Sequence, residues 1–393
     1  MHPALTKPKV SRFGRCRVLI FAVFYFPLFV RATDLTQLSD EFDDAGSLIH
    51  WSRIYQTEGW SNNVLEVFDA NTSRPGQLVM MPYTSVWFDE WRGELTYKTV
   101  TGNFAITTFV EPRNRAGLAR PEQDYSLAGI MVRVPRAMTN AAQWTPNGQN
   151  YIFLSMGAAN RTTALYQFEV KSTVNSTSTL FVTDTVATRA AIQVARLGPY
   201  LITLRREEGQ DWAVHRRYFR PDFPDLVQAG LTVYTDWNTC FAVGPENNNQ
   251  LVLTNGATLL NSSTLSGAQP DLIATFDYVR FARISIPPAW AEADLMNEVE
   301  VSDAELLTYL GEPLNVPGGA VVPAELISSP DTGDVFRMTA NVTSQRSYRV
   351  QTAIAMPGPW LDAWGFVSTN VSVSLEHAIG EAEQENYFRL VSP

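Results

Sequence analysis

The stretch FDYVRFARISI, residues Phe276–Ile286, decides the fold class because its side chains alternate. Successive side chains of a β-strand point to opposite faces of a sheet. A period of two places mostly apolar residues on one face, which Arg280 interrupts: Phe276, Tyr278, Ala282, Ile284 and Ile286. The other face is mixed and holds Asp277, Val279, Phe281, Arg283 and Ser285. This pattern predicts a half-buried antiparallel strand.

Similar short runs recur upstream of this stretch. Residues 103–110 (NFAITTFV) place Phe104, Ile106 and Val110 on one face, and residues 200–204 (YLITL) are short and apolar. In WAVHRRYF, residues 212–219, the same period predicts one shared face for Trp212, Val214, Arg216 and Tyr218. Many short strands bounded by Gly, Pro and Asn, with few helices between them, predict an all-β sandwich or barrel.

One helix interrupts the strand pattern. Ser302 and Glu305 have the spacing of a capping box, and leucines at 306, 307 and 310 follow at helical spacing before Gly311. The surrounding stretch, Pro287–Pro323, contains five prolines. The sequence therefore predicts a linker with a short packing helix over residues 287–324. It would join a large domain, 33–286, to a small β domain, 325–393.

The amino terminus has the pattern of an export signal. Residues 1–17 carry five basic residues and no acid, and a 13-residue apolar run follows from Val18 to Val30. The run is followed by Ala32, a small residue of the kind that precedes a signal-peptide cleavage site. This arrangement predicts a signal peptide over 1–32, cleaved after Ala32, and a secreted extracellular or periplasmic protein. A retained membrane anchor is the alternative, although a spanning helix needs about 20 residues. After cleavage no transmembrane segment is expected.

The charge balance of the chain limits the partners that are expected, and its cysteine content limits the disulfides that it can form. Residues 1–32 hold six of the 30 basic residues, which leaves 24 against 40 acidic residues in the mature chain. This acidic balance disfavours nucleic acid as a partner. Only Cys240 survives processing, so an internal disulfide is excluded and the fold must rest on its core.

The order of features in the large domain resembles the concanavalin A-like lectin/glucanase superfamily. The features are an acidic start at 39–43, then Trp51, YKTVTGNF (97–104), YSLAGIMVR (125–133), GQDW (209–212), AGLTVY (229–234) and FDYV (276–279). They look closest to modules found beside glycoside hydrolases in exported bacterial proteins. The resemblance implies a two-sheet jelly roll with a concave face, and in many relatives that face meets carbohydrate.

The carboxyl-terminal part carries a second resemblance. RSYRVQT (346–352), Trp360 and NYFRLV (386–391) look like the small fibronectin-type-III-like β-sandwich of exported bacterial proteins. The segment before Trp360 departs from the usual pattern of that family. The complete expectation is thus a jelly roll, a short helical linker and a small β-sandwich.

Aromatic residues make binding the favoured function. Aromatic residues form 11% of the chain, and ten of them are Trp. Trp and Tyr offer flat faces to sugar rings while acids, amides and Arg bond the hydroxyl groups. The candidate carbohydrate-binding residues are Trp60, Trp87, Asp89, Glu90, Trp91, Trp212, Arg216 and Trp237. Burial in the core of the sandwich is the alternative for each Trp.

Signals for catalysis and for metal are thinner. The sandwich lacks the alternating Glu-x-Asp-x-Glu motif of hydrolases with this fold, and no zinc spacing or nucleophile elbow occurs. His215 is expected to be an exposed strand residue and Cys240 a buried thiol. Asp40, Asp43 and Asp44 are weak calcium candidates, with turn formation as the alternative, and no other cofactor is expected.

Three functions stay open at this stage. The favoured one is an exported lectin-like protein that binds a polysaccharide or glycan and has no evident catalytic site. The second is a glycoside hydrolase or lyase of the same fold with an atypical carboxylate site. The third is a structural protein of the cell surface.

Overall fold

The computed structural model describes residues 35–60, 63–160, 163–244, 268–284 and 286–312, together with six strands between residues 324 and 391. The predicted signal peptide lies outside the described residues, as do residues 313–323 of the predicted linker. In the described part of the chain, none of the helices is both long enough and apolar enough to cross a membrane.

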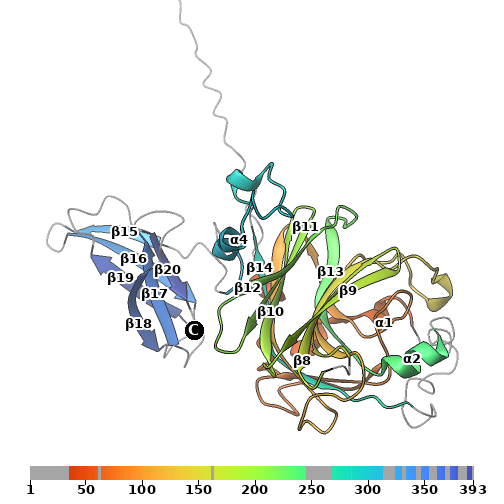
Figure 1. Cartoon of the computed structure of the whole chain (residues 1–393). Helices are drawn as coiled ribbons and strands as arrows, with labels where there is room; N and C mark the ends of the chain where they lie inside the picture. The colour runs from red at the N-terminus through yellow and green to blue at the C-terminus, as the bar shows by residue number, and fades with distance from the viewer. Residues whose placement is uncertain are drawn as a thin grey trace, which may run out of the picture. The chain divides into compact units, whose positions relative to one another are not determined.

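Two seven-stranded antiparallel sheets form the large domain (Figure 1). In spatial order, sheet I contains β1 (Ser52–Arg53), β4 (Thr96–Thr101), β13 (Leu226–Tyr234), β6 (Ser126–Arg133), β7 (Tyr151–Ala158), β8 (Tyr166–Val174) and β9 (Thr177–Thr185). Sheet II contains β12 (Ala213–Phe219), β11 (Tyr200–Glu207), β10 (Ala190–Leu197), β5 (Phe104–Arg113), β14 (Ile273–Arg283), β3 (Leu78–Pro82) and β2 (Leu65–Ala70). This architecture confirms the predicted all-β jelly-roll sandwich.

The apolar faces of the two sheets meet in one core. Phe104, Ile106 and Val110 of β5 are fully buried there, as their alternation predicted. Sheet I contributes Leu154 from β7 and Phe168 from β8, which are also fully buried. Burial of this apolar layer supplies the main stabilising free energy, because no disulfide assists it.

Two β-bulges change which residues face that core. In β14 the register shifts between Phe276 and Val279, so Phe276, Val279 and Phe281 all point inward. Tyr278 and Arg280 consequently lie on the outer face of sheet II, where they meet Glu312. The predicted assignment of the two faces is therefore wrong beyond the bulge, because an extra residue inverts the alternation.

The second bulge lies where β11 meets β12. The register shifts between Thr203 and Leu204, whose partners are Arg216 and Val214, and His215 is the extra residue. Trp212 and Val214 pack on the outer face of sheet II, whereas Tyr218 packs against the inner core. The predicted shared face of these residues is wrong for the same reason.

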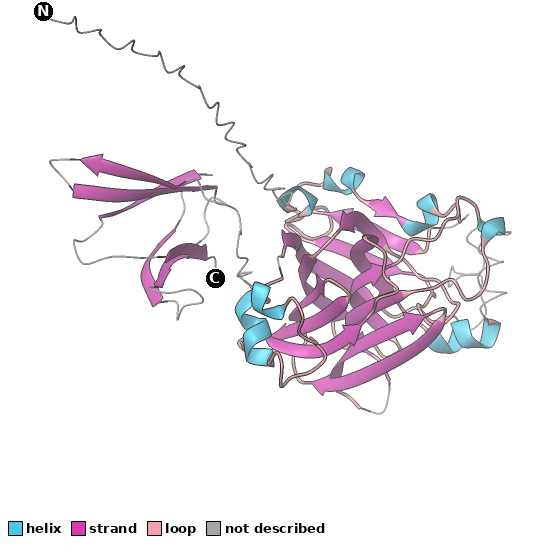
Figure 2. Ribbon diagram, turned by 90° about the horizontal axis from the view of Figure 1, so that it is seen from above, coloured by secondary structure: helices cyan, strands magenta, loops and turns pink. Residues whose placement is uncertain are grey.

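Helices are short and confined to the connections (Figure 2). They comprise η1 (Thr36–Leu38), η2 (Ser47–His50), α1 (Ile54–Thr57), η3 (Ala141–Gln143), α2 (Trp237–Val243), η5 (Pro288–Trp290) and α4 (Asp303–Tyr309). The last is the predicted helix, and its capping box is formed. The Ser302 hydroxyl accepts a hydrogen bond from the Glu305 amide at 3.2 Å, and the Glu305 carboxylate accepts one from the Ser302 amide at 2.8 Å.

The stretch 288–312 covers the outer face of sheet II. Trp290, Leu295 and Leu306 are buried against apolar residues of the sheet, among them Ile202 and Leu204. The first half of the predicted linker is therefore part of the packed sandwich, because it buries apolar surface that the sheet would otherwise expose.

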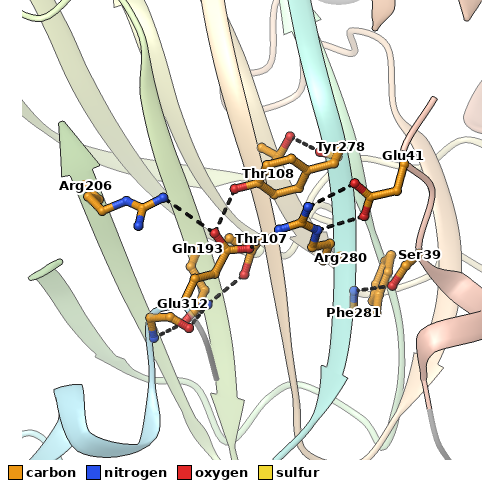
Figure 3. A network of polar contacts seen from close by, with 11 residues as sticks. Ser39, Glu41, Thr107, Thr108, Gln193, Arg206, Tyr278, Arg280, Phe281 and Glu312 are labelled. Atoms are coloured by element: carbon orange, nitrogen blue, oxygen red, sulfur yellow. Dashed lines mark hydrogen bonds and ion pairs between the residues drawn. The ribbon is translucent and has the colours of Figure 1, made fainter. Parts of the chain in front are cut away.

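A polar network fastens the end of this stretch to the sheet (Figure 3). Glu312 accepts a hydrogen bond from the Tyr278 hydroxyl at 2.8 Å and pairs with Arg280 at 3.3 Å. Arg280 also donates two hydrogen bonds to Glu41, at 2.8 and 2.9 Å. The Gln193 side chain binds the Gly311 amide at 2.9 Å and the Gly311 carbonyl at 3.2 Å. These contacts hold Gly311 and Glu312 in place on sheet II.

The carboxyl-terminal part consists of strands. One three-stranded antiparallel sheet contains β15 (Ala324–Ser329), β16 (Gly333–Asn341) and β19 (Ser372–Ala378). The other contains β18 (Leu361–Val367), β17 (Ser347–Ala353) and β20 (Tyr387–Val391).

We expect Leu306→Ala to lower the free energy of unfolding by about 2–5 kcal/mol, because it opens a cavity between α4 and sheet II. Chemical denaturation followed by tryptophan fluorescence measures this change. Val299→Ala is the matched control, since that side chain is 94% exposed and should change stability by less than about 0.5 kcal/mol. Equal effects of the two substitutions would show that the 288–312 stretch is not part of the core.

Candidate functional site

The outer face of sheet I is covered by two segments, residues 84–95 and α2. The indole nitrogen of Trp87 donates a hydrogen bond to the Glu94 carbonyl at 2.7 Å, which closes the first segment on itself. The indole nitrogen of Trp91 donates to the carbonyl of Cys240 at 3.1 Å and so joins the two segments. Asp236 caps α2 by accepting a hydrogen bond from the Thr239 amide.

A buried ion pair lies beneath the first segment. Glu169 and Lys171 are two residues apart on β8, so both side chains point to the outer face of sheet I. The Lys171 ammonium lies 3.0 Å from the Glu169 carboxylate and donates hydrogen bonds to the Trp87 carbonyl at 2.6 Å and to the Tyr234 hydroxyl at 2.7 Å. The Tyr234 hydroxyl in turn donates to Glu169 at 3.1 Å. All three donor positions of the ammonium are used.

Burial shifts the pKa values of Lys171 and Tyr234. It lowers the pKa of Lys171, which the neighbouring Glu169 opposes by favouring the charged ammonium. Burial also raises the pKa of Tyr234 well above its usual value, and the charge of Glu169 raises it further. Tyr234 therefore stays a neutral hydroxyl at physiological pH and can both accept and donate a hydrogen bond.

A cavity of about 150 Å³ opens beside the ion pair. Five aromatic side chains and the Lys171 side chain form most of its wall; the aromatic residues are Trp87, Phe88, Tyr125, Tyr234 and Trp237. Trp237 lies at the centre of this group, with its ring 5.1 Å from that of Phe88 and 6.0 Å from that of Tyr125. The cavity therefore combines flat apolar faces with a few polar atoms, which is typical of small-ligand sites.

Three of the predicted binding tryptophans are buried. Trp87 is fully buried, and Trp60 and Trp91 retain 3% and 8% exposure. They do not form the exposed platform expected for residues 51–63 and 83–91, because the segment 84–95 folds its own aromatic residues against sheet I. Trp87 still reaches the cavity with one edge.

The two predicted acids hold loops in place. The Asp89 carboxylate accepts a hydrogen bond from the Ser178 amide at 2.8 Å, and Asp89 has a positive φ of 43°. The Glu90 carboxylate accepts one from the Asn147 amide at 2.5 Å. The first contact ties the 84–95 segment to β9, and the second ties it to the connection before β7.

The remaining candidates lie apart from one another. Trp237 is half-buried and lines the cavity at the start of α2. Trp212 is half-buried on the outer face of sheet II, where the Arg206 guanidinium lies 5.1 Å from its ring. Arg216 is exposed and stacks on Phe181 at 4.5 Å. Of the predicted binding residues, the structure therefore brings Trp87 and Trp237 together at one cavity.

Two further expectations concern single residues. Cys240 is a buried free thiol, as expected, and burial raises its pKa well above the usual value. His215 is half-buried rather than exposed, because the bulge at this position turns its ring toward Phe168. Burial, followed by the charges of Arg205 and Arg216, lowers the pKa of His215 to about 3.

Carboxylates of the described residues serve the fold rather than a common centre. The Asp40 carboxylate accepts hydrogen bonds from the Phe42 amide and the Trp51 indole, each at 2.9 Å. Asp44 accepts one from the Gly46 amide, and the carbonyl of Asp43 accepts one from Asn71. Among the residues that the structure describes, no group of three or more His, Cys, Asp or Glu is placed to hold a metal ion.

Sequence reasoning missed Glu169, Lys171, Tyr125 and Tyr234. One signal for the first two was available, since the strand YQFEVKSTV places opposite charges two residues apart within an otherwise apolar context. Two charges that must share one buried face are a pair, because an isolated buried charge is costly. The approach of Tyr125 to Trp237 depends on a long-range connection that no local pattern records.

Comparison with known proteins concerns the fold. No protein-family model and no curated protein matches the chain. Solved structures similar to it include a prokaryotic β-1,3-1,4-glucanase (lichenase) from a mouse hindgut metagenome, with a TM-score of 0.34 and 13% identity, which covers 63% of this chain and 98% of the other. A metal-free lectin from Griffonia simplicifolia has a TM-score of 0.35 and 11% identity over 62% of this chain and 98% of that chain. A xylan β-1,4-xylosidase from Bacillus halodurans has a TM-score of 0.38 and 11% identity over 62% of this chain and 39% of that chain.

The Lys171→Met substitution should lower the free energy of unfolding by about 3–5 kcal/mol, because it leaves the Glu169 carboxylate buried without its cation. Denaturant titration measures the loss. Replacing both residues, Glu169→Gln with Lys171→Met, should be less destabilising than Lys171→Met alone. Arg189→Met is the control, since its pairing with Glu208 is exposed and is worth less than about 1 kcal/mol. A double variant as unstable as the single one would contradict the role given to the pair.

His215 should make stability depend on pH. Its pKa is about 3 in the folded chain and has a usual value of 6.5, so the unfolded chain binds the proton between these values and the folded chain does not. Lowering the pH from about 7 to about 4 should therefore reduce the free energy of unfolding. Urea titrations should show a shallower pH dependence for His215→Asn than for the wild type. Parallel curves would place His215 in solvent.

Proposed function

We propose that the chain is an exported carbohydrate-binding protein that takes one sugar unit of a glycan into the cavity beside Trp237. The observation that carries this proposal is the composition of the cavity wall, in which aromatic faces from three separate segments surround the Lys171 and Tyr234 side chains. The fold agrees with this class, as two stacked antiparallel sheets place the cavity on the outer face of sheet I, next to the segments that cover it.

The chemistry of the wall fits a sugar. A pyranose ring presents C–H bonds on its faces and hydroxyl groups on its rim, and Trp and Tyr rings stack on the former. Trp237, Phe88 and Tyr125 are the half-buried members of the aromatic group, so this part of the wall reaches solvent. The volume of about 150 Å³ equals that of about five water molecules, which suits a single ring rather than a long chain.

Binding is favoured over hydrolysis by the nature of the polar groups. A glycosidase needs two carboxyl groups on opposite sides of the scissile bond, about 5–10 Å apart. The described residues that line the cavity include no Asp or Glu, and the Glu169 carboxylate behind the wall is held by Lys171 and Tyr234. The polar groups of the wall can bond hydroxyl groups but do not supply an acid and a nucleophile.

The other parts of the chain complete the proposal. Export follows from the basic and apolar amino terminus, which we interpret as a cleaved signal peptide. The carboxyl-terminal strands are proposed to be a fibronectin-type-III-like unit that serves as a spacer.

We expect Trp237→Ala to weaken binding to the best ligand of a glycan array by about tenfold or more, because it removes the central stacking face. Calorimetric titration with that ligand measures the change, and circular dichroism verifies folding. Trp212→Ala is the matched control, since Trp212 is also half-buried but lies on the other sheet. Trp237→Phe should recover part of the affinity.

The opposite result would be equally informative. Loss of binding in Trp212→Ala but not in Trp237→Ala would move the site to sheet II. Release of reducing sugars from the bound glycan would make the protein a hydrolase, and the absence of binding to every glycan would remove the proposal.

A further inference from the structure

A second polar cluster lies on the outer face of sheet I, near β1 and α1. It contains two buried ion pairs. The Arg53 guanidinium donates two hydrogen bonds to Glu94, both at 2.9 Å, and the Arg133 guanidinium donates one to Glu58 at 2.7 Å. Glu94 and Arg133 are fully buried, and Glu58 is 2% exposed. Each of these carboxylates is therefore already matched by one cation.

Arg92 adds a third cation to this cluster. Its side chain is 2% exposed, and its guanidinium lies over the Trp60 ring at 4.5 Å. None of its three nitrogens has a hydrogen-bond acceptor within the described ranges of the chain. Burial lowers the pKa of Arg92 to about 10, so the group remains charged at neutral pH. A buried charge without an acceptor is unfavourable, which makes Arg92 an unusual residue for a purely structural role.

Other unused groups nearby are also donors. Among the described residues, the Gln149 side-chain nitrogen, one Arg136 nitrogen and the Trp144 indole nitrogen are buried without an acceptor. They adjoin the ion pairs, since the Gln149 oxygen accepts two hydrogen bonds from Arg133 at 3.1 Å and the Arg136 guanidinium lies 6.0 Å from the Trp144 ring. The cluster thus has a surplus of donors.

Side-chain and backbone contacts connect Arg92 to these groups. Trp60, beneath Arg92, donates its indole hydrogen to Glu58 at 3.0 Å, and Glu58 binds Arg133. Gly59 lies against the backbone of residues 139–140, so closely that a side chain would overlap the Thr139 carbonyl at 2.1 Å. The segment that holds Trp60 and the connection that holds Arg136 and Trp144 are therefore in direct contact. Arg136 and Trp144 are only half-buried, so the cluster reaches solvent on this side.

We propose that this donor cluster receives the carboxylate of an acidic sugar residue, so that the glycan taken up by the protein contains uronic acid. The inference rests on the proposed function and adds the class of ligand to it. A carboxylate is planar and presents two acceptors, which match the fork of a guanidinium such as Arg92. Trp87 joins the two sites, since its ring lines the cavity and lies 5.6 Å from the Arg133 guanidinium.

The negative charge of the whole chain does not oppose this assignment. At physiological ionic strength, charges more than about 8 Å apart are largely screened, so an incoming acid responds mainly to the local cations. The cluster holds the guanidinium groups of Arg53, Arg92, Arg133 and Arg136 against the carboxylates of Glu58, Glu90 and Glu94. Four cations against three anions leave a local positive charge beside the cavity.

The test compares uronic-acid oligosaccharides, sulfated oligosaccharides and neutral oligosaccharides of equal length by calorimetric titration. Wild-type protein should prefer the uronic acid chain. Arg92→Gln should weaken that binding by about ten- to a hundredfold, the loss expected for a buried charge-assisted hydrogen bond, and leave the neutral chain unchanged. Arg189→Gln, which removes a half-exposed arginine of sheet II, is the charge control and should change neither.

The stability of a second variant separates a binding role from a structural one. Arg92→Met removes the unpaired charge, so without ligand its melting temperature should equal or exceed that of the wild type. A clearly lower melting temperature would identify Arg92 as structural and overturn the inference. Equal binding of neutral and acidic chains would overturn it while the proposed function stands, and preference for the sulfated chain would replace the carboxylate with a sulfate ester. Absence of all glycan binding would remove both proposals.

Discussion

The contact between the Lys171 ammonium and the Trp87 carbonyl determines how the outer face of sheet I is built. An ammonium that is buried under a tryptophan is tolerable only when every donor has an acceptor, and here a carboxylate, a hydroxyl and a backbone carbonyl supply them. Because one of these acceptors belongs to the covering segment, the segment cannot lift without depriving the ammonium of one acceptor. The ion pair is thus one point at which 84–95 is attached to the sheet.

That attachment explains why the face is only partly open. Trp87 and Trp91 fill most of the space above the sheet, and α2 closes one side through the bond between Trp91 and the Cys240 carbonyl. What remains is a small aromatic cavity next to a cationic cluster. An open sheet would offer a long groove, whereas this arrangement leaves room for no more than a short segment of the proposed ligand.

Much of the fold follows from local alternation in the sequence. The run 103–110 places Phe104, Ile106 and Val110 as a period of two requires, and the capping box at Ser302 marks the start of α4. Alternation fails at the bulges near Val279 and His215, because one extra residue inverts every later side chain while the composition stays the same. The all-β class could be predicted in this way, but not which face each side chain occupies beyond a bulge.

The candidate site could be predicted from the sequence less well than the fold. Tryptophan content indicated a binding surface, and Trp237 lies at a cavity, yet the richest stretch, 83–91, turned inward. Whether a Trp side chain is stacked on a ligand or packed into a core depends on which segment folds over it. Arg92, whose guanidinium lacks an acceptor among the described residues, could not be recognised from the sequence for the same reason. The number of acceptors around a guanidinium depends on which segments come together on the folded sheet.

The two hydrogen bonds between Gln193 and Gly311 affect how the sandwich bears a pulling force. One amide side chain on β10 serves both the amide and the carbonyl of Gly311, and Glu312 follows with its bonds to Tyr278 and Arg280. A pulling force that is applied through the carboxyl-terminal strands acts on these bonds before it acts on α4, because residues 311 and 312 follow α4 in the chain. The load is then spread over two strands of sheet II, β10 and β14, so the sandwich can resist a pull without unravelling from its last helix.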